Sequence, residues 1–155
     1  MPEEETERIG RTYVIHDTRT IDRQQAEIFE YAADFSNSAE WDPGVDSAKA
    51  DDPGPVRVGS SYSLEGTFGP STLPMRYEVL EYEPPNRVVL KGRGEKFDAL
   101  DTMEFMASGD GSTRISYTAE ITLFGPLRFL GPLMNWPLDR MGKRALDGLV
   151  EALQR

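Results

Sequence analysis

The chain has 155 residues, with 27 acidic and 17 basic side chains and a formal net charge of −10 at pH 7. A chain of this length has enough residues for one hydrophobic core, so we expect a single domain. It contains no cysteine and one histidine, which excludes disulfides, thiolate nucleophiles and zinc sites built from several such ligands within one chain. The acidic balance argues against nucleic acid as a partner, because that binding relies on clustered Lys and Arg.

The two ends of the chain differ in character. Residues 1–10 begin with four glutamates and one arginine among the first eight positions, which predicts a flexible acidic arm before a domain at residues 11–155. No signal-peptide pattern is present, and three prolines interrupt the most apolar stretch, residues 121–138. We therefore expect no stable membrane insertion and a cytoplasmic location.

The first elements are a strand and a helix. Residues 11–21 are rich in Thr, Val, Ile and Tyr, which favour a strand, and Asp22 is a suitable N-cap for a following helix. Apolar residues then recur near the helical period over residues 23–34, and a short helical turn extends to Trp41.

The rest of the chain predicts an antiparallel meander and a last helix. Strand patterns separated by Gly, Pro, Asn and Asp turns occupy residues 59–68, 73–83, 87–92, 96–107 and 112–123. Alternation in these strands gives the sheet one apolar face. A helix that begins near Pro137 carries an apolar stripe. We expect an α+β fold in which the sheet curls around this helix.

Several short motifs occur in a characteristic order along the chain. Trp41-Asp42-Pro43-Gly44-Val45 follows the first helix, a Gly109-Asp110-Gly111 turn lies within the meander, and Phe124-Gly125-Pro126-Leu127 precedes the last helix. With these marks, residues 12–155 resemble the START-related SRPBCC superfamily, and more narrowly its polyketide cyclase/dehydrase and lipid-transport branch. The resemblance implies a helix-grip (START/Bet v 1-like) fold, a curved antiparallel sheet wrapped around a long C-terminal helix with an apolar cavity between them.

Large, adaptable side chains are the candidates for contact with a ligand in such a cavity, because ligand pockets are mostly apolar. Each of them is also a plausible ordinary core residue. Glycines at positions 66, 142 and 148 remove side-chain volume, which either leaves room for a ligand or permits close packing of helix on sheet. The candidate ligand-binding residues are Trp41, Tyr62, Tyr77, Phe97, Met103, Tyr117, Met134 and Met141.

Asp101 and His16 are the candidate catalytic residues. Strict alternation places Asp101 on the same face as Ala99 and Met103, where burial raises the pKa of a carboxyl group and suits it to act as an acid, a base or a ligand anchor. A bulge or a paired Arg is the structural alternative for Asp101. His16 is the one side chain with an ordinary pKa near neutrality, although a lone histidine in a strand is more often structural.

Other chemistry finds no support in the sequence. There is no Gly-x-Ser-x-Gly elbow and no phosphate-binding loop, and the acidic residues near Asp51 lack EF-hand spacing. We therefore predict neither a metal nor a cofactor. Residues 124–136 combine aromatic and aliphatic side chains with Gly and Pro, a pattern compatible with packing under the sheet rim or with a lip for ligand entry or membrane contact.

Three functions are consistent with these features. The first is binding or transport of a hydrophobic small molecule, such as a lipid, an isoprenoid or an aromatic polyketide, in the cavity between sheet and helix. The alternative is a polyketide aromatase/cyclase or dehydratase, in which Asp101 or His16 moves protons and tyrosine hydroxyls hold enolates. The third is a protein-interaction module, which a filled core would favour and a cavity of several hundred Å³ would not.

Overall fold

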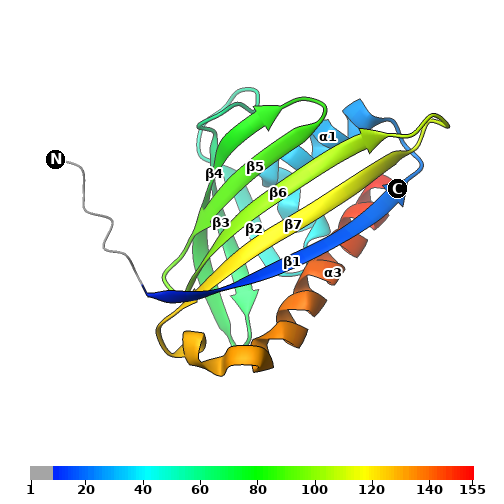
Figure 1. Ribbon diagram of the computed structural model, residues 1–155. Helices are drawn as coiled ribbons and strands as arrows, with labels where there is room; N and C mark the ends of the chain where they lie inside the picture. The colour runs from blue at the N-terminus through cyan, green and yellow to red at the C-terminus, as the bar shows by residue number, and fades with distance from the viewer. Residues whose placement is uncertain (1–8) are drawn as a thin grey trace.

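The computed structural model describes residues 9–155, so the predicted acidic arm lies outside the described residues except for Ile9 and Gly10. The chain begins with a strand and three short helical segments, and a run of six strands leads into two C-terminal helical segments (Figure 1). The elements are β1 (Gly10–Ile21), α1 (Gln25–Ala33), the 3-10 helix η1 (Phe35–Asn37), α2 (Ser38–Trp41), β2 (Val45–Ala50), β3 (Ser61–Phe68), β4 (Ser71–Glu83), β5 (Arg87–Arg93), β6 (Phe97–Ala107), β7 (Thr113–Phe124), η2 (Gly125–Met134) and α3 (Asn135–Leu153).

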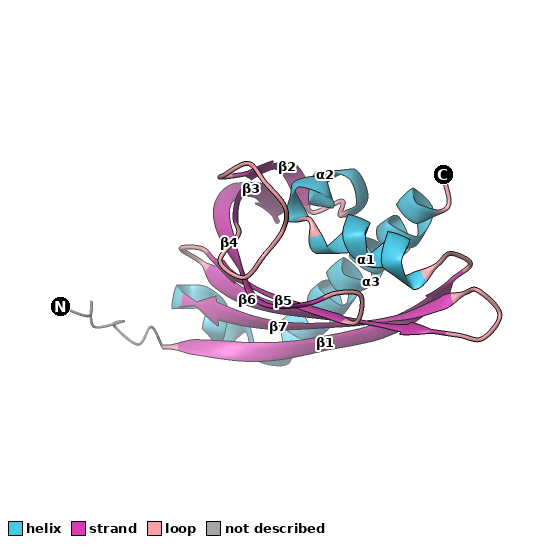
Figure 2. Cartoon of the chain, turned by 90° about the horizontal axis from the view of Figure 1, so that it is seen from above, coloured by secondary structure: helices cyan, strands magenta, loops and turns pink. Residues whose placement is uncertain are grey.

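Within residues 9–155, seven strands form one antiparallel sheet in the order β1-β7-β6-β5-β4-β3-β2. The chain meanders from β2 to β7, and β1 pairs with β7 along its whole length. The sheet curves strongly between β5 and β2, which brings β2 next to α2 (Figure 2). Helix α3 lies along β1 and contacts α2. This arrangement confirms the predicted α+β helix-grip fold.

Three details differ from the sequence prediction. Strand β2 was not predicted, because it is a short edge strand with a register shift between Val45 and Ser47 that interrupts the alternation. Asp22 is not the N-cap of α1. The Arg23 amide donates a hydrogen bond to the Ile21 carbonyl, so the chain turns before the helix begins, and Gln24 occupies the N-cap position without a side-chain hydrogen bond. The 3-10 segment η2 was also not predicted as an element, and it contains a break at Gly131, whose φ of 56° favours glycine.

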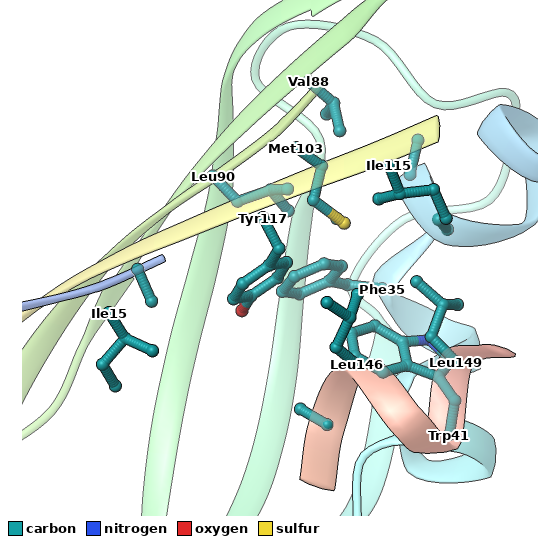
Figure 3. Packing of buried hydrophobic residues seen from close by; sticks show 14 of the residues in the cluster. Ile15, Phe35, Trp41, Val88, Leu90, Met103, Ile115, Tyr117, Leu146 and Leu149 are labelled. Atoms are coloured by element: carbon teal, nitrogen blue, oxygen red, sulfur yellow. The ribbon is translucent and has the colours of Figure 1, made fainter. Parts of the chain in front are cut away.

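The inner face of the sheet is apolar, as the alternation predicted. Tyr62 and Leu64 of β3 are buried, as is every second residue of β7 from Ile115 to Leu123. Leu146 and Leu149 of α3 pack against Phe35 and Trp41 at one end of this core (Figure 3). No helix among residues 9–155 combines the length and apolar character needed to cross a bilayer.

Helix α3 approaches the backbone of α2 unusually closely at Gly148. A Cβ atom at this position would collide with the carbonyl oxygen of Trp41. For Gly148, close packing is therefore the correct interpretation. Gly142 also permits a close approach, since a Cβ atom there would lie 2.5 Å from the Ile15 side chain, and it lines the cavity described below. The contact at Gly148 fixes the distance between α3 and the loop that follows Trp41.

Replacing Gly148 by Ala tests this contact. Ala favours helix by about 1 kcal/mol over Gly, but the collision with Trp41 forces α3 away from α2, so we expect Gly148→Ala to lower the free energy of unfolding by about 1–3 kcal/mol. A Cβ atom at Gly109 would have no neighbour within 4 Å, and this glycine has no positive φ, so Gly109→Ala serves as the control with little expected effect. Urea unfolding measures both, and a Gly148→Ala protein as stable as the control contradicts the assignment.

Candidate ligand cavity

A partly enclosed space of about 290 Å³ lies between the concave face of the sheet and α3. Strands β1, β3, β4, β6 and β7, the loop from Asp42 to Gly44 and the N-terminal half of α3 contribute to its wall. Most of the wall is apolar and includes Ile15, Leu64, Phe68, Met75, Phe97 and Ile121. A wider depression of about 650 Å³ lies on the outer side of β2–β5, but it is open to solvent and lined by charged side chains such as Lys49, Glu65, Arg76 and Arg93. It offers no enclosed apolar volume.

Small residues explain why the core is hollow at this point. Ala99 and Ala119 on the sheet and Ala145 on α3 line the space. Gly66 and Gly142 also line it, and they pack closely on the Gly44 carbonyl and the Ile15 side chain. Protein interiors are normally packed without voids of this size. The sequence therefore leaves room between sheet and helix by placing small residues on both.

A close approach also orients Tyr77. A Cβ atom added at Gly92 would lie 2.5 Å from the Tyr77 ring, so the ring lies directly over the β5 backbone. Gly92 pairs with Tyr77 on one side and with Ala99 of β6 on the other. Because Gly92 and Ala99 are both small, the Tyr77 ring extends across the sheet into the cavity.

Asp101 is the most buried polar group of the cavity. Its side chain lies on the inner face of β6, between Leu90 and Ala119 on the neighbouring strands, and the residue is 5% exposed. The pKa of Asp101 is raised to about 7, chiefly because of burial. A hydrogen bond from the Tyr117 hydroxyl lowers this pKa, and the nearby Asp42 carboxyl raises it. At neutral pH, Asp101 therefore exists in comparable amounts as acid and carboxylate.

Asp42 is a second carboxyl group on the cavity wall, and the sequence analysis did not single it out. It follows α2, and its Oδ1 accepts a 2.9 Å hydrogen bond from the Gly44 amide. Burial raises the pKa of Asp42, and this hydrogen bond lowers it. An Asp-Pro-Gly sequence indicates a turn, but nothing in it shows that the turn covers a cavity. Only the contact between α2 and α3 decides that.

Two tyrosines complete the polar cluster. Burial raises the pKa of both Tyr77 and Tyr117 well above the ordinary value, and the charge of Asp101 raises it further. Figure 3 shows the Tyr117 hydroxyl projecting away from the packed group around Trp41 and Leu149. We call Asp42, Tyr77, Asp101 and Tyr117 the polar cluster.

The predicted site residues separate into two groups. Tyr77, Phe97, Asp101, Tyr117 and Met141 line the cavity together. Four further candidates are buried side chains outside the cavity lining, where they pack in the core: Trp41, Tyr62, Met103 and Met134. Trp41 forms an edge-to-face contact with Phe35, at 6.1 Å between ring centroids.

His16 does not join Asp101. It is exposed on the outer face of β1, where its Nδ1 lies 2.8 Å from the Thr118 hydroxyl oxygen. The reason is the strand alternation, because its neighbour Ile15 occupies the inward position and lines the cavity. The structure corrects the proposal that His16 acts in the cavity.

Residues 124–136, which include η2, have features of both arrangements considered above: packing under the sheet rim and an exposed apolar surface. Leu127 and Met134 pack against the core, and the Tyr13 hydroxyl donates a 2.7 Å hydrogen bond to the Gly131 carbonyl. Other large apolar side chains point into solvent and are 67–76% exposed: Phe129, Leu133 and Trp136. Arg128 lies over the Phe129 ring and Arg140 over the Trp136 ring. The segment is therefore anchored on one side and exposes an apolar surface on the other.

Cations are scarce near the cavity. Arg144 of α3 is exposed at the edge of the cavity and makes no ion pair with any residue in the described part of the chain. Among residues 9–155, no group of three or more His, Cys, Asp or Glu side chains is arranged to hold a metal ion.

Several solved structures share this fold. An aromatase/cyclase from Streptomyces sp. R1128 is 11% identical, with a TM-score of 0.75 over 94% of this chain and 95% of its own. The protein TTHA0849 from Thermus thermophilus is 18% identical, with a TM-score of 0.76 over 90% of this chain and 95% of its own. A START superfamily protein from Mycobacterium smegmatis is 15% identical, with a TM-score of 0.70 over 90% of this chain and 93% of its own.

At these identities the structural likeness concerns the fold alone. No curated protein sequence matches the chain significantly. The sequence profile of one family, described as polyketide cyclase/dehydrase and lipid transport, matches residues 13–154, which is nearly the whole chain. The helix-grip fold and this match lead to one conclusion: the chain belongs to the polyketide cyclase/dehydrase and lipid transport family.

Proposed function

We propose that the chain binds or transports a hydrophobic small molecule, such as a lipid, an isoprenoid or an aromatic polyketide, in the cavity between the sheet and α3. The observation that carries this proposal is a partly enclosed, mainly apolar space of about 290 Å³ with a few convergent polar groups. Pockets for small ligands begin at roughly 300 Å³ and have this composition. The family match supports a hydrophobic ligand in general terms.

The lining of the cavity also favours a ligand over a protein-interaction module. Ala119 occurs where a larger side chain would stabilise an empty core by burying more apolar surface. The polar cluster lines the same space, where a ligand can reach it. A ligand would fill the volume and form hydrogen bonds with the polar cluster, so ligand binding would account for both the small residues and the polar groups.

A second candidate is an aromatase/cyclase or dehydratase, and Asp101 is the observation that favours it. A general acid or base works best with a pKa near the operating pH, and the pKa of Asp101 is raised to about 7. Tyr77 lines the same cavity, and its hydroxyl is a donor for a developing enolate oxygen. His16 has no part in this mechanism, because it faces solvent on the other side of the sheet.

Filling the cavity tests the proposed ligand binding. Ala119 is buried on the inner face of β7, so Ala119→Leu places extra volume in the space where the ligand would lie. We expect the affinity for the neutral apolar probe N-phenyl-1-naphthylamine, measured by fluorescence titration, to fall about tenfold or more. Glu120→Leu, on the exposed outer face of the same strand, is the matched control. Equal binding by both variants would falsify the location of the site.

The burial of Asp101 predicts a characteristic pH dependence of stability. The folded protein keeps the Asp101 proton up to about pH 7, whereas the unfolded chain releases it near pH 4, so raising the pH between these values favours unfolding. Asp101→Asn removes this penalty. We expect the variant to gain stability relative to wild type, by about 2–3 kcal/mol more at pH 8 than at pH 5. Denaturant unfolding at both values measures the difference.

Glu104→Gln is the control for this measurement, because Glu104 is exposed on the outer face of the same strand and pairs with Arg87 at 3.4 Å. Its stability relative to wild type should be the same at pH 5 and pH 8. A flat difference for Asp101→Asn as well would show that Asp101 is not protonated in the folded protein near neutral pH.

The enzyme candidate requires a separate measurement. Incubation with a poly-β-keto thioester should give cyclised product, and Asp101→Asn should lower the turnover at least about 100-fold, the low end for loss of a general acid or base. Glu104→Gln should leave it unchanged. A nearly normal rate in Asp101→Asn removes Asp101 from the mechanism.

A further inference from the structure

We propose that the polar cluster selects a hydrophobic ligand with a cationic, hydrogen-bond-donating head, so that the preferred occupant of the cavity is a long-chain amine. This inference rests on the proposed ligand-binding function and specifies the chemistry of its ligand. The cavity has two carboxyl groups on its wall, Asp42 and Asp101, and its one basic lining residue in the described chain, Arg144, is exposed at the edge.

Hydrogen-bond acceptors outnumber donors in the polar cluster. Each carboxylate has two oxygens, and each oxygen accepts up to two hydrogen bonds. Among the described residues, the Gly44 amide donates to Asp42 and the Tyr117 hydroxyl donates to Asp101. Both carboxyl groups line the cavity, where a ligand can use their remaining acceptor capacity. A ligand that brings donors therefore satisfies this site better than a ligand that brings acceptors.

The burial of Asp101 makes these donors valuable. A carboxylate that is 5% exposed has lost nearly all of its hydration, and no cationic side chain of the described chain compensates it. A charge buried without a partner is costly, and an opposite charge in an apolar site is attracted far more strongly than in water. An ammonium group supplies one positive charge and three donors. The rings of Tyr77 and Tyr117, which line the same space, are favourable neighbours for a cation.

Other head groups fit this cluster less well. A fatty-acid carboxylate would bring a third acidic group beside Asp42 and Asp101 and add only acceptors. A ketone also adds only an acceptor, so it could accept a hydrogen bond from the Tyr77 hydroxyl or from protonated Asp101 but would supply no donor to a carboxylate. An alcohol offers one donor without a charge. The cluster therefore predicts the order amine, alcohol, then ketone and acid.

Protonation of the site provides a second signature. Besides Asp101 itself, four titratable groups line the cavity: Asp42 from the loop after α2, Tyr77 from β4, Tyr117 from β7 and Arg144 from α3. The pKa of Asp101 is raised to about 7. An amine remains cationic below about pH 10, so its binding near neutral pH releases the Asp101 proton. The affinity for the amine must then rise with pH up to about 7–8.

The test compares four ligands with chains of similar length on the full chain: decylamine, 1-decanol, 2-undecanone and decanoic acid. Isothermal titration calorimetry at pH 8 should give decylamine an affinity at least about tenfold above that of decanol, with decanoic acid weakest. Between pH 8 and pH 6, the affinity for decylamine should fall about tenfold while that for decanol stays constant.

Variants assign the effect to the polar cluster. Asp101→Asn should lower the affinity for decylamine at pH 8 at least about tenfold and abolish its pH dependence. Asp42→Asn should weaken decylamine binding in the same direction. Binding of decanol to both variants shows that the fold and the cavity persist. Glu104→Gln, on the outer face of β6, is the charge-matched control and should bind decylamine as wild type does.

The outcomes separate the inference from the function on which it rests. If decanol or decanoic acid binds as tightly as decylamine, or if decylamine binding is independent of pH, the inference is wrong while the proposed function stands. If none of the four ligands binds, both are wrong. Tight, pH-dependent binding of decylamine that is lost in Asp101→Asn supports both.

Discussion

The packing of α3 against α2 and the sheet determines everything that the cavity contains. At Gly148 the helix backbone lies against the Trp41 carbonyl, where no side chain fits between them. Earlier in α3, Gly142 packs closely on the Ile15 side chain of β1, and Gly142 and Ala145 also line the cavity. The helix is thus held by close contacts at two glycines and borders the cavity beside one of them. The loop after Trp41, with Asp42, is held over the cavity because α2 is fixed to α3.

Within this cavity the protein tolerates an arrangement that is unfavourable by itself. Asp101 lies among apolar residues at the centre of the sheet, and its main compensation in the described chain is the Tyr117 hydroxyl. A leucine or valine at this position would stabilise an empty core better, since burying a carboxyl group costs free energy whether it is ionised or holds a proton. Positions where the residue present lowers the stability of the fold are typically functional positions. The amine proposal explains why this free-energy cost is tolerated, because a cationic ligand would supply a charged partner for Asp101.

The fold itself is shared by proteins of different description, including an aromatase/cyclase and a START superfamily protein. The helix-grip fold therefore places a cavity between sheet and helix, while the residues on the cavity wall determine which ligand binds there. In this chain the wall combines apolar strands, two carboxyl groups and two tyrosines. The exposed side chains of Phe129, Leu133 and Trp136 lie on η2 and the first turn of α3, the helix that forms one wall of the cavity.

The amino-acid sequence by itself determined most of the elements, although not β2 or η2, and the faces of the strands. The period of two in β3, β6 and β7 was sufficient to place Tyr62 and Tyr117 inward, and to place Asp101 beside them, because a strand directs alternate side chains to opposite faces. The same rule, applied to β1, turns His16 outward and Ile15 inward. Only the tertiary structure decided which buried residues face empty space. Trp41, Met103 and Tyr77 have similar sequence signals, yet Tyr77 alone of the three lines the cavity. Asp42 joins the site through the contact of α2 with α3, and such long-range packing distances have no signature in the local sequence pattern.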